Sequence, residues 1–273
     1  MPKLGEYEFL LDLPFFLYPD KQSALVGSKF GGTGFLIAIP YKNHPDIFHH
    51  IYGVTNAHVA LGNKRSGVIR FNKKQGGTDM FETSQSDWFS MPGEYDIAIL
   101  PIDFLNPSIH KVEPINISSK DPFSFNLSDS DISNFRINAG DDVFMIGRFV
   151  DCDGITTNQP SLRFGNISIM SANIPSPLGY TGRTIVLDMR SRTGYSGSPV
   201  FVYRTHGSIF AKPDSLITGG HLLKLLGIHR GQFYEDKSEP SAMSIVHPTS
   251  AIWEVLNLPE LVEMRSKKES QIG

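Results

Sequence analysis

The chain is poor in cysteine, in net charge and in long apolar runs, and each shortage excludes a class of protein. Cys152 is the single cysteine, so no internal disulfide framework can hold the fold together. This fits a protein of a reducing compartment. The neighbours of this cysteine, Asp151 and Asp153, supply no positive charge that would favour a thiolate, which argues against a catalytic thiol.

The formal net charge is only −3, and no long basic run occurs. We therefore expect no nucleic-acid partner and no anionic membrane partner. No apolar segment approaches the length of a membrane span, and Glu6 and Glu8 stand where a signal peptide would be cationic. These absences predict a cytoplasmic protein, although a trimmed mature chain would look the same.

Short apolar runs between Gly, Pro, Asn and Asp clusters dominate the sequence, for example at residues 34–39, 97–102 and 143–149. Such runs are typical of β-strands, and no regular alternation with helices accompanies them, so we expect an all-β barrel or sandwich. The chain has 273 residues, 40% of them hydrophobic, which is enough for a sizeable core. One helix is predicted, at residues 249–256, where Pro248 and Thr249 supply a start signal. Residues 263–273 are predicted to form a polar, frayed tail.

Three motifs carry side chains of hydrolytic chemistry. Residues 193–199 predict a tight exposed turn that presents Ser196 just before an apolar strand. Residues 54–59 place His58 at the end of another strand, and residues 94–100 place Asp96 at the head of a third. The order His, Asp, Ser is one of three triad orders that separate otherwise unrelated hydrolase folds. Because the three residues are remote along the chain, only folding can bring them together.

These motifs resemble those of the chymotrypsin-like (trypsin-fold) serine endopeptidases, nearest to the disulfide-free bacterial glutamyl endopeptidases and high-temperature-requirement proteases. Residues 32–37, 141–147 and 226–231 resemble other strands of that family. The resemblance implies two six-stranded antiparallel β-barrels with a C-terminal helix. It implies a peptidase domain over residues 1–262, with halves at about 1–125 and 126–262, followed by the polar tail at 263–273. Residues 106–140 would connect the two halves.

The chemistry assigns a role to each residue. Serine is a poor nucleophile near neutral pH, so Ser196 needs a base, and histidine, with an ordinary pKa near neutrality, makes His58 the candidate. Asp96 would orient the imidazole and stabilise its charged form. The backbone N–H groups of Gly194 and Ser196 would form the oxyanion hole. Taken singly, His58 could be a core histidine, Asp96 a strand cap, and the Ser196 segment a structural turn; their joint order favours catalysis.

One position departs from the vertebrate digestive members of the family. They carry aspartate immediately before the nucleophile, where it pairs with a new N-terminus after zymogen cleavage, whereas this chain has Tyr195. Activation by such trimming is therefore not expected. Whether Tyr195 permits a preformed oxyanion hole stays open, since some relatives keep this loop collapsed until a ligand or partner arrives.

The resemblance also implies a specificity pocket. Its predicted walls contain the residues Arg190, Ser191, Thr193, His229, Arg230 and Gly231. His229 occupies the position that glutamyl endopeptidases and glutamine-selective viral relatives use for the side chain before the scissile bond, and Arg190 stands where trypsin-like enzymes carry aspartate. Cleavage after Glu, Asp or Gln is thus one interpretation. The other is that His229 only bonds a backbone carbonyl and that the arginines point to solvent.

No metal or organic cofactor is expected. His44, His49 and His50 lack the spacing of a zinc motif and are interpreted as surface residues. The expected partners are a protein or peptide substrate and, as a further interpretation, an activating protein that orders the Ser196 loop. The alternative from another class is a catalytically silent pseudo-peptidase that binds peptide in the same cleft.

Overall fold

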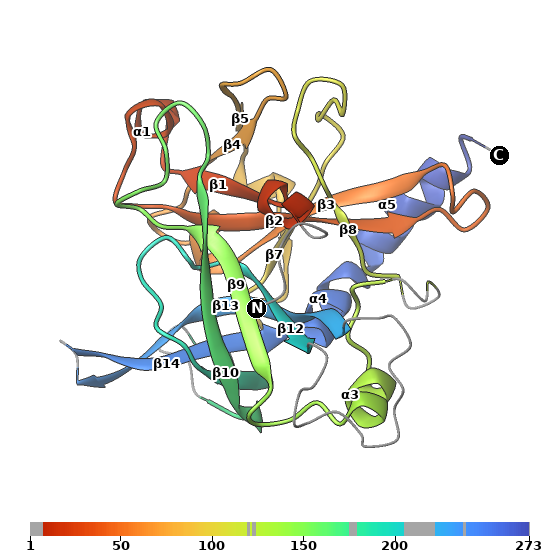
Figure 1. The fold of residues 1–273 in the computed structure, drawn as a ribbon. Helices are drawn as coiled ribbons and strands as arrows, with labels where there is room; N and C mark the ends of the chain where they lie inside the picture. Colours follow the sequence, from red (N-terminus) through yellow and green to blue (C-terminus); the bar gives the residue numbers. More distant parts are fainter. Residues whose placement is uncertain are drawn as a thin grey trace.

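A computed structural model of the chain describes residues 8–118, 121, 124–174, 179–204, 222–236 and 239–272. The strands form two groups, drawn in the upper and lower parts of Figure 1, with two helices at the C-terminal end beside them. The predicted all-β architecture with a C-terminal helix is confirmed. Within the described ranges, no helix is both long enough and apolar enough to cross a bilayer.

The N-terminal group is a single eight-stranded sheet. Its strands are β1 (Pro14–Tyr18), β2 (Gly32–Pro40), β3 (His49–Thr55), β4 (Val68–Asn72), β5 (Thr78–Glu82), β6 (Phe89–Ser90), β7 (Ala98–Pro101) and β8 (Ile115–Asn116). They run in the order β5-β4-β1-β2-β3-β7-β6, and β8 pairs in parallel with β2. The family resemblance implied a six-stranded barrel here. The described strands instead leave β5 and β6 as open ends, because β6 and β8 are only two residues long and add short pairings rather than closing the sheet.

The C-terminal group is a closed barrel of six antiparallel strands, as predicted. The strands are β9 (Asp142–Arg148), β10 (Pro160–Ala172), β11 (Thr184–Asp188), β12 (Pro199–Arg204), β13 (Leu222–Asp236) and β14 (Glu239–Pro248). Their order around the barrel is β10-β11-β14-β13-β12-β9. The long strands β10 and β13 carry register shifts, and such bulges help a sheet to bend until it closes.

Strand β9 shows how the two groups pack. Successive side chains of a strand point to opposite faces. Val143 and Met145 accordingly lie in the core of the C-terminal barrel, whereas Phe144 and Ile146 belong to the larger apolar cluster that also contains the core of the N-terminal sheet. Strand β9 is thus buried on both faces, which fixes one group against the other.

The helices are α1 (Lys21–Val26), α2 (Ala57–Ala60), α3 (Asp129–Phe135), α4 (Thr249–Leu256) and α5 (Pro259–Glu269), with short 3₁₀ segments at η2 (Glu8–Asp12) and η3 (Gln85–Asp87). Helix α4 has the predicted bounds. The predicted frayed tail is wrong for residues 263–269, because α5 continues through them. It starts with Pro259, carries Lys267 and Lys268 in its last turn, and buries only Leu261. This helix has favourable residues at both ends but buries very little apolar surface. It therefore lacks the periodic apolar stripe by which a helix is predicted from sequence.

Candidate active site

His58 and Asp96 meet because β3 and β7 are antiparallel neighbours. Thr55, at the end of β3, pairs with Ala98, at the start of β7. The chain continues from β3 into α2, which contains His58, while Asp96 lies two residues before β7. His58 Nδ1 is 2.5 Å from Asp96 Oδ2, and the His58 backbone N–H donates to Oδ1 over 2.8 Å. One carboxylate therefore holds both the ring and the main chain of the histidine.

Further polar groups enclose Asp96, which is fully buried. Its backbone carbonyl accepts from Asn56 Nδ2 over 2.7 Å, and its backbone N–H donates to His247 Nε2 over 3.2 Å. The Tyr180 hydroxyl bonds the Asp96 carboxylate, and burial together with this carboxylate raises the pKa of Tyr180 to about 12. Tyr180 therefore keeps its proton at neutral pH and acts as a donor. The charge of Arg230 is close enough to stabilise the carboxylate further.

His247 is held as a neutral ring. Burial, and then the charge of Arg230, lower its pKa to about 4. Nδ1 lies 3.4 Å from the Arg183 carbonyl, which only accepts, and Nε2 faces the Asp96 backbone N–H, which only donates. These partners require the tautomer with its proton on Nδ1.

Two successive tight turns present Ser196. Tyr195 N–H donates to the Arg192 carbonyl over 3.3 Å, and Ser198 N–H donates to the Tyr195 carbonyl over 2.9 Å. The third residue of each turn is a glycine with positive φ, +99° at Gly194 and +86° at Gly197. This is the type II pattern, which favours glycine at that position. The repeated Gly spacing of the motif is thus explained by backbone geometry.

The hydrogen bonds of this loop leave two N–H groups available. The Tyr195 carbonyl accepts from Ser198 N–H and from His229 Nδ1, the latter over 3.1 Å. In a trans peptide the N–H points opposite to the C=O, so the Ser196 N–H faces away from these donors. Among the described residues, no acceptor is assigned to the N–H of Gly194 or of Ser196. Both groups fit the predicted oxyanion hole.

The Ser196 loop lies against the N-terminal sheet next to α2. The Ser196 carbonyl accepts from Thr33 N–H over 2.8 Å. A Cβ placed on Gly32 would be 2.9 Å from the Ser196 carbonyl oxygen and 2.9 Å from the Val59 side chain, so only one glycine separates this loop from the residue after His58. Within the described part of the chain no hydrogen bond joins the His58 ring to the Ser196 hydroxyl. The structure thus brings the His–Asp pair and the serine turn to the same region.

Tyr195 is fully buried in the C-terminal barrel. Its hydroxyl bonds Ser161 Oγ and accepts from Arg163 Nε over 3.3 Å. The side chain that precedes Ser196 is therefore anchored within the barrel by neutral and cationic partners on β10.

The predicted pocket residues divide into two sets. Arg190 and Thr193 are exposed, while Ser191, His229 and Arg230 are buried and Gly231 is half-buried. Burial lowers the pKa of His229 to about 4, so the ring is neutral near pH 7. Its Nδ1 must then carry the proton that bonds the Tyr195 carbonyl. The buried atoms His229 Nε2 and Arg230 Nη1 have no partner among the described residues.

Several of these neighbours could not be found by sequence reasoning. Tyr180 comes from the connection before β11 and His247 from β14, and neither position has a motif. Three or more His, Cys, Asp or Glu side chains arranged to hold a metal ion are not found in the described ranges. Cys152 is exposed and free.

A family profile decides the relationship: the trypsin-like peptidase domain matches residues 32–210, more than half of the chain. The chain belongs to the trypsin-like peptidases. Its fold is similar to the MamO protease domain from Magnetospirillum magneticum (apo form), with TM-score 0.53 and 12% identity over 91% of this chain and 97% of that one. The HtrA-type protease AlgW with decapeptide matches with TM-score 0.48 and 19% identity over 85% of this chain and 51% of that one, so the peptidase spans about half of AlgW. No curated protein matches its sequence.

Proposed function

We propose that this trypsin-like peptidase is a serine endopeptidase that works through an acyl-enzyme. The observation that carries the proposal is the His58–Asp96 pair, with its 2.5 Å contact, beside a Ser196 turn whose neighbouring N–H donors have no acceptor among the described residues. A buried carboxylate paired to a half-exposed imidazole is the arrangement that general base catalysis requires.

The proposed reaction has two halves. His58 takes the proton of the Ser196 hydroxyl while the oxygen bonds the peptide carbonyl carbon. The resulting tetrahedral intermediate breaks its C–N bond, and His58 returns the proton to the departing amine. A water molecule then attacks the ester with the same base, and Ser196 recovers its proton. Asp96 keeps the ring oriented and offsets its charge in both halves.

The negative oxygen of each tetrahedral intermediate would accept hydrogen bonds from the N–H groups of Gly194 and Ser196. Losing one such donor typically lowers kcat by roughly 10²- to 10³-fold. The two type II turns support this role, because they fix the peptides on either side of both donors before substrate arrives. Tyr195 contributes through its buried side chain, which anchors the segment between the donors.

For specificity we propose a preference for Gln, Glu or Asp before the scissile bond, with Gln ahead at neutral pH. A neutral His229 whose Nδ1 proton bonds a carbonyl offers only an acceptor at Nε2. That acceptor suits the N–H of a glutamine amide, whereas a carboxylate must first gain a proton. Of the two arginines predicted to line the pocket, Arg190 is exposed and Arg230 is buried.

Peptide-library profiling at pH 7.5 and 5.5 tests the specificity. We expect cleavage after Gln at both values and a rise in cleavage after Glu at the lower pH. Strong cleavage after Lys, Leu or Phe, with none after Gln or Glu, would contradict the pocket assignment without affecting the catalytic one.

Covalent labelling with a fluorophosphonate tests catalysis itself. We expect labelling of the wild type and its loss in Ser196→Ala and His58→Ala. Ser198→Ala is the matched control, because the Ser198 hydroxyl is buried without a partner among the described residues and alanine keeps the backbone N–H of the turn. Absence of labelling in a folded wild type would favour the silent pseudo-peptidase, and labelling that appears only with an added partner would favour an activated enzyme.

A further inference from the structure

Thr33, the second residue of β2, contacts the serine turn from the opposite half of the molecule. It is fully buried. Its backbone N–H donates to the Ser196 carbonyl over 2.8 Å, and its hydroxyl donates to the Gly194 carbonyl over 2.7 Å. Thr33 therefore binds the carbonyl groups of the same two residues whose N–H groups form the proposed oxyanion hole.

The direction of the hydroxyl bond is fixed. The Arg148 backbone N–H donates to Thr33 Oγ1 over 2.8 Å, so the oxygen is an acceptor there and its own proton is free for Gly194. A Cβ on Gly147 would be 3.0 Å from the same oxygen, which shows how closely the chain surrounds it. The Thr33 carbonyl in turn accepts from Thr55 Oγ1 over 2.6 Å. Every polar group of Thr33 is thus engaged.

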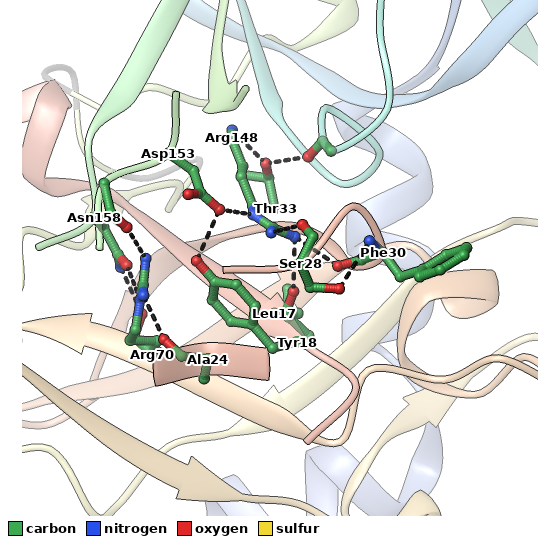
Figure 2. Close-up of polar contacts among 12 residues, drawn as sticks. Leu17, Tyr18, Ala24, Ser28, Phe30, Thr33, Arg70, Arg148, Asp153 and Asn158 are labelled. Carbon is green, nitrogen blue, oxygen red and sulfur yellow. Dashed lines mark hydrogen bonds and ion pairs between the residues drawn. The ribbon is translucent and has the colours of Figure 1, made fainter. Parts of the chain in front are cut away.

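A buried polar cluster immobilises Arg148, whose backbone N–H donates to the Thr33 hydroxyl (Figure 2). The Arg148 guanidinium pairs with Asp153 at 2.6 Å, donates to the Phe30 carbonyl over 2.8 Å and lies over the Tyr18 ring at 4.1 Å. The Tyr18 hydroxyl donates to Asp153 over 3.0 Å. Arg148 is fully buried, so its charge ties the segment after β9 to β1 and to the chain before β2.

We propose that Thr33 is a positioning residue of the oxyanion hole. Its hydroxyl fixes the Gly194–Tyr195 peptide at the carbonyl end, while the Arg192 carbonyl holds the N–H end. Without the hydroxyl, both the Gly194 carbonyl and the Arg148 N–H lose their partner in a buried place. The Gly194–Tyr195 peptide then rotates to recover hydrogen bonds. The adjoining Thr193–Gly194 peptide, which carries the Gly194 N–H, moves with it through the shared Gly194 Cα, and this N–H no longer points at the oxyanion. This inference rests on the proposed serine peptidase function.

The test compares Thr33→Val, Thr33→Ser and a matched control. Valine keeps the shape and the backbone bond to Ser196 but lacks the hydroxyl, and serine restores the hydroxyl. Thr184→Val is the control, because the Thr184 hydroxyl is equally buried and donates a 2.9 Å hydrogen bond to the Ala172 carbonyl. This bond does not involve the serine turn. The substrate is p-nitrophenyl acetate, an ester that needs a nucleophile and an oxyanion hole but no specificity pocket.

We expect Thr33→Val to lower the acylation rate constant by roughly 10- to 100-fold, less than outright loss of a donor, with less than a twofold change in substrate affinity. In Thr33→Ser the acylation rate constant should return to within about threefold of the wild-type value, and Thr184→Val should have the wild-type rate constant. An unchanged rate in Thr33→Val, equal losses in both valine variants, or no rescue by serine would overturn the proposal.

Amide hydrogen exchange separates this proposal from the function on which it rests. If the wild type reacts with neither ester nor fluorophosphonate, the serine peptidase assignment fails, but the positioning role still predicts faster exchange over residues 192–198 in Thr33→Val alone. Exchange in that segment equal to that of the wild type would refute the positioning role whatever the activity.

Discussion

Acid should destabilise the fold through two buried histidines that also hold the site together. His247 accepts from the Asp96 backbone N–H, and His229 donates to the Tyr195 carbonyl. Burial lowers the pKa of each from 6.5 to about 4. Between these values the unfolded chain binds protons that the folded chain does not, so stability falls as pH drops from 6.5 and levels off below about 4. Protonation of His247 at Nε2 also removes the acceptor of the Asp96 backbone N–H.

The magnitude follows from the two pKa values. Between pH 8 and pH 5 each histidine should withdraw about 2 kcal/mol from the free energy of unfolding, or about 4 kcal/mol together. Ordinary carboxylates titrate mainly below pH 5, so this window reports on histidines. A loss of this size is a large fraction of the 5–15 kcal/mol that is typical of a domain.

Urea denaturation at pH 8, 7, 6 and 5 measures the effect, with His247→Gln as the comparison. Glutamine can accept from Asp96 N–H and donate to the Arg183 carbonyl but does not titrate. We expect the variant to lose about 2 kcal/mol less than the wild type between pH 8 and 5. Equal losses in the two proteins would refute the reasoning, because His247 would then not be held neutral by its surroundings.

Three substitutions extend the account. Tyr180→Phe removes the hydroxyl that bonds Asp96 and should lower kcat/KM roughly 5- to 30-fold, about 1–2 kcal/mol, in steady-state kinetics; an unchanged value would mean that this bond is not used in catalysis. Gly197→Ala places a Cβ 2.0 Å from the Thr33 carbonyl oxygen at a positive φ, so calorimetry should show more than about 2 kcal/mol of destabilisation, and a smaller loss would contradict the close packing. Asp153→Ala leaves a buried guanidinium unpaired and should cost about 3–5 kcal/mol in denaturant titrations, whereas a cost below 1 kcal/mol would show that the cluster is hydrated.

Much of the fold could be predicted because its signals are local. Turn residues between short apolar runs predicted the strands, and the start signal at Pro248 predicted α4 with its observed bounds. The extra strands of the N-terminal sheet could not be predicted, because two-residue pairings such as β6 have no pattern of their own. Helix α5 lacked an apolar stripe and depends on tertiary contacts such as His50–Glu269 at 3.0 Å and Arg265–Tyr52 at 3.3 Å.

The candidate site could be predicted only where its residues lie within motifs. The serine turn could be predicted from the glycines that its backbone requires. His58 and Asp96 could be predicted from their positions beside apolar strands. Tyr180 and the buried cluster of Arg148 with Tyr18 could not be found in this way. They act through contacts between segments remote in sequence, and an arginine or tyrosine with no spacing rule looks like any surface residue until the two halves pack.

The most direct measurement of the central claim is a crystal structure of the protein after reaction with a peptidyl diphenyl phosphonate. The account predicts a bond from Ser196 Oγ to phosphorus, with the phosphonyl oxygen at about 2.7–3.1 Å from the backbone nitrogens of Gly194 and Ser196 and the His58 ring beside Ser196. An adduct on another residue, or a phosphonyl oxygen directed away from both nitrogens, would contradict it.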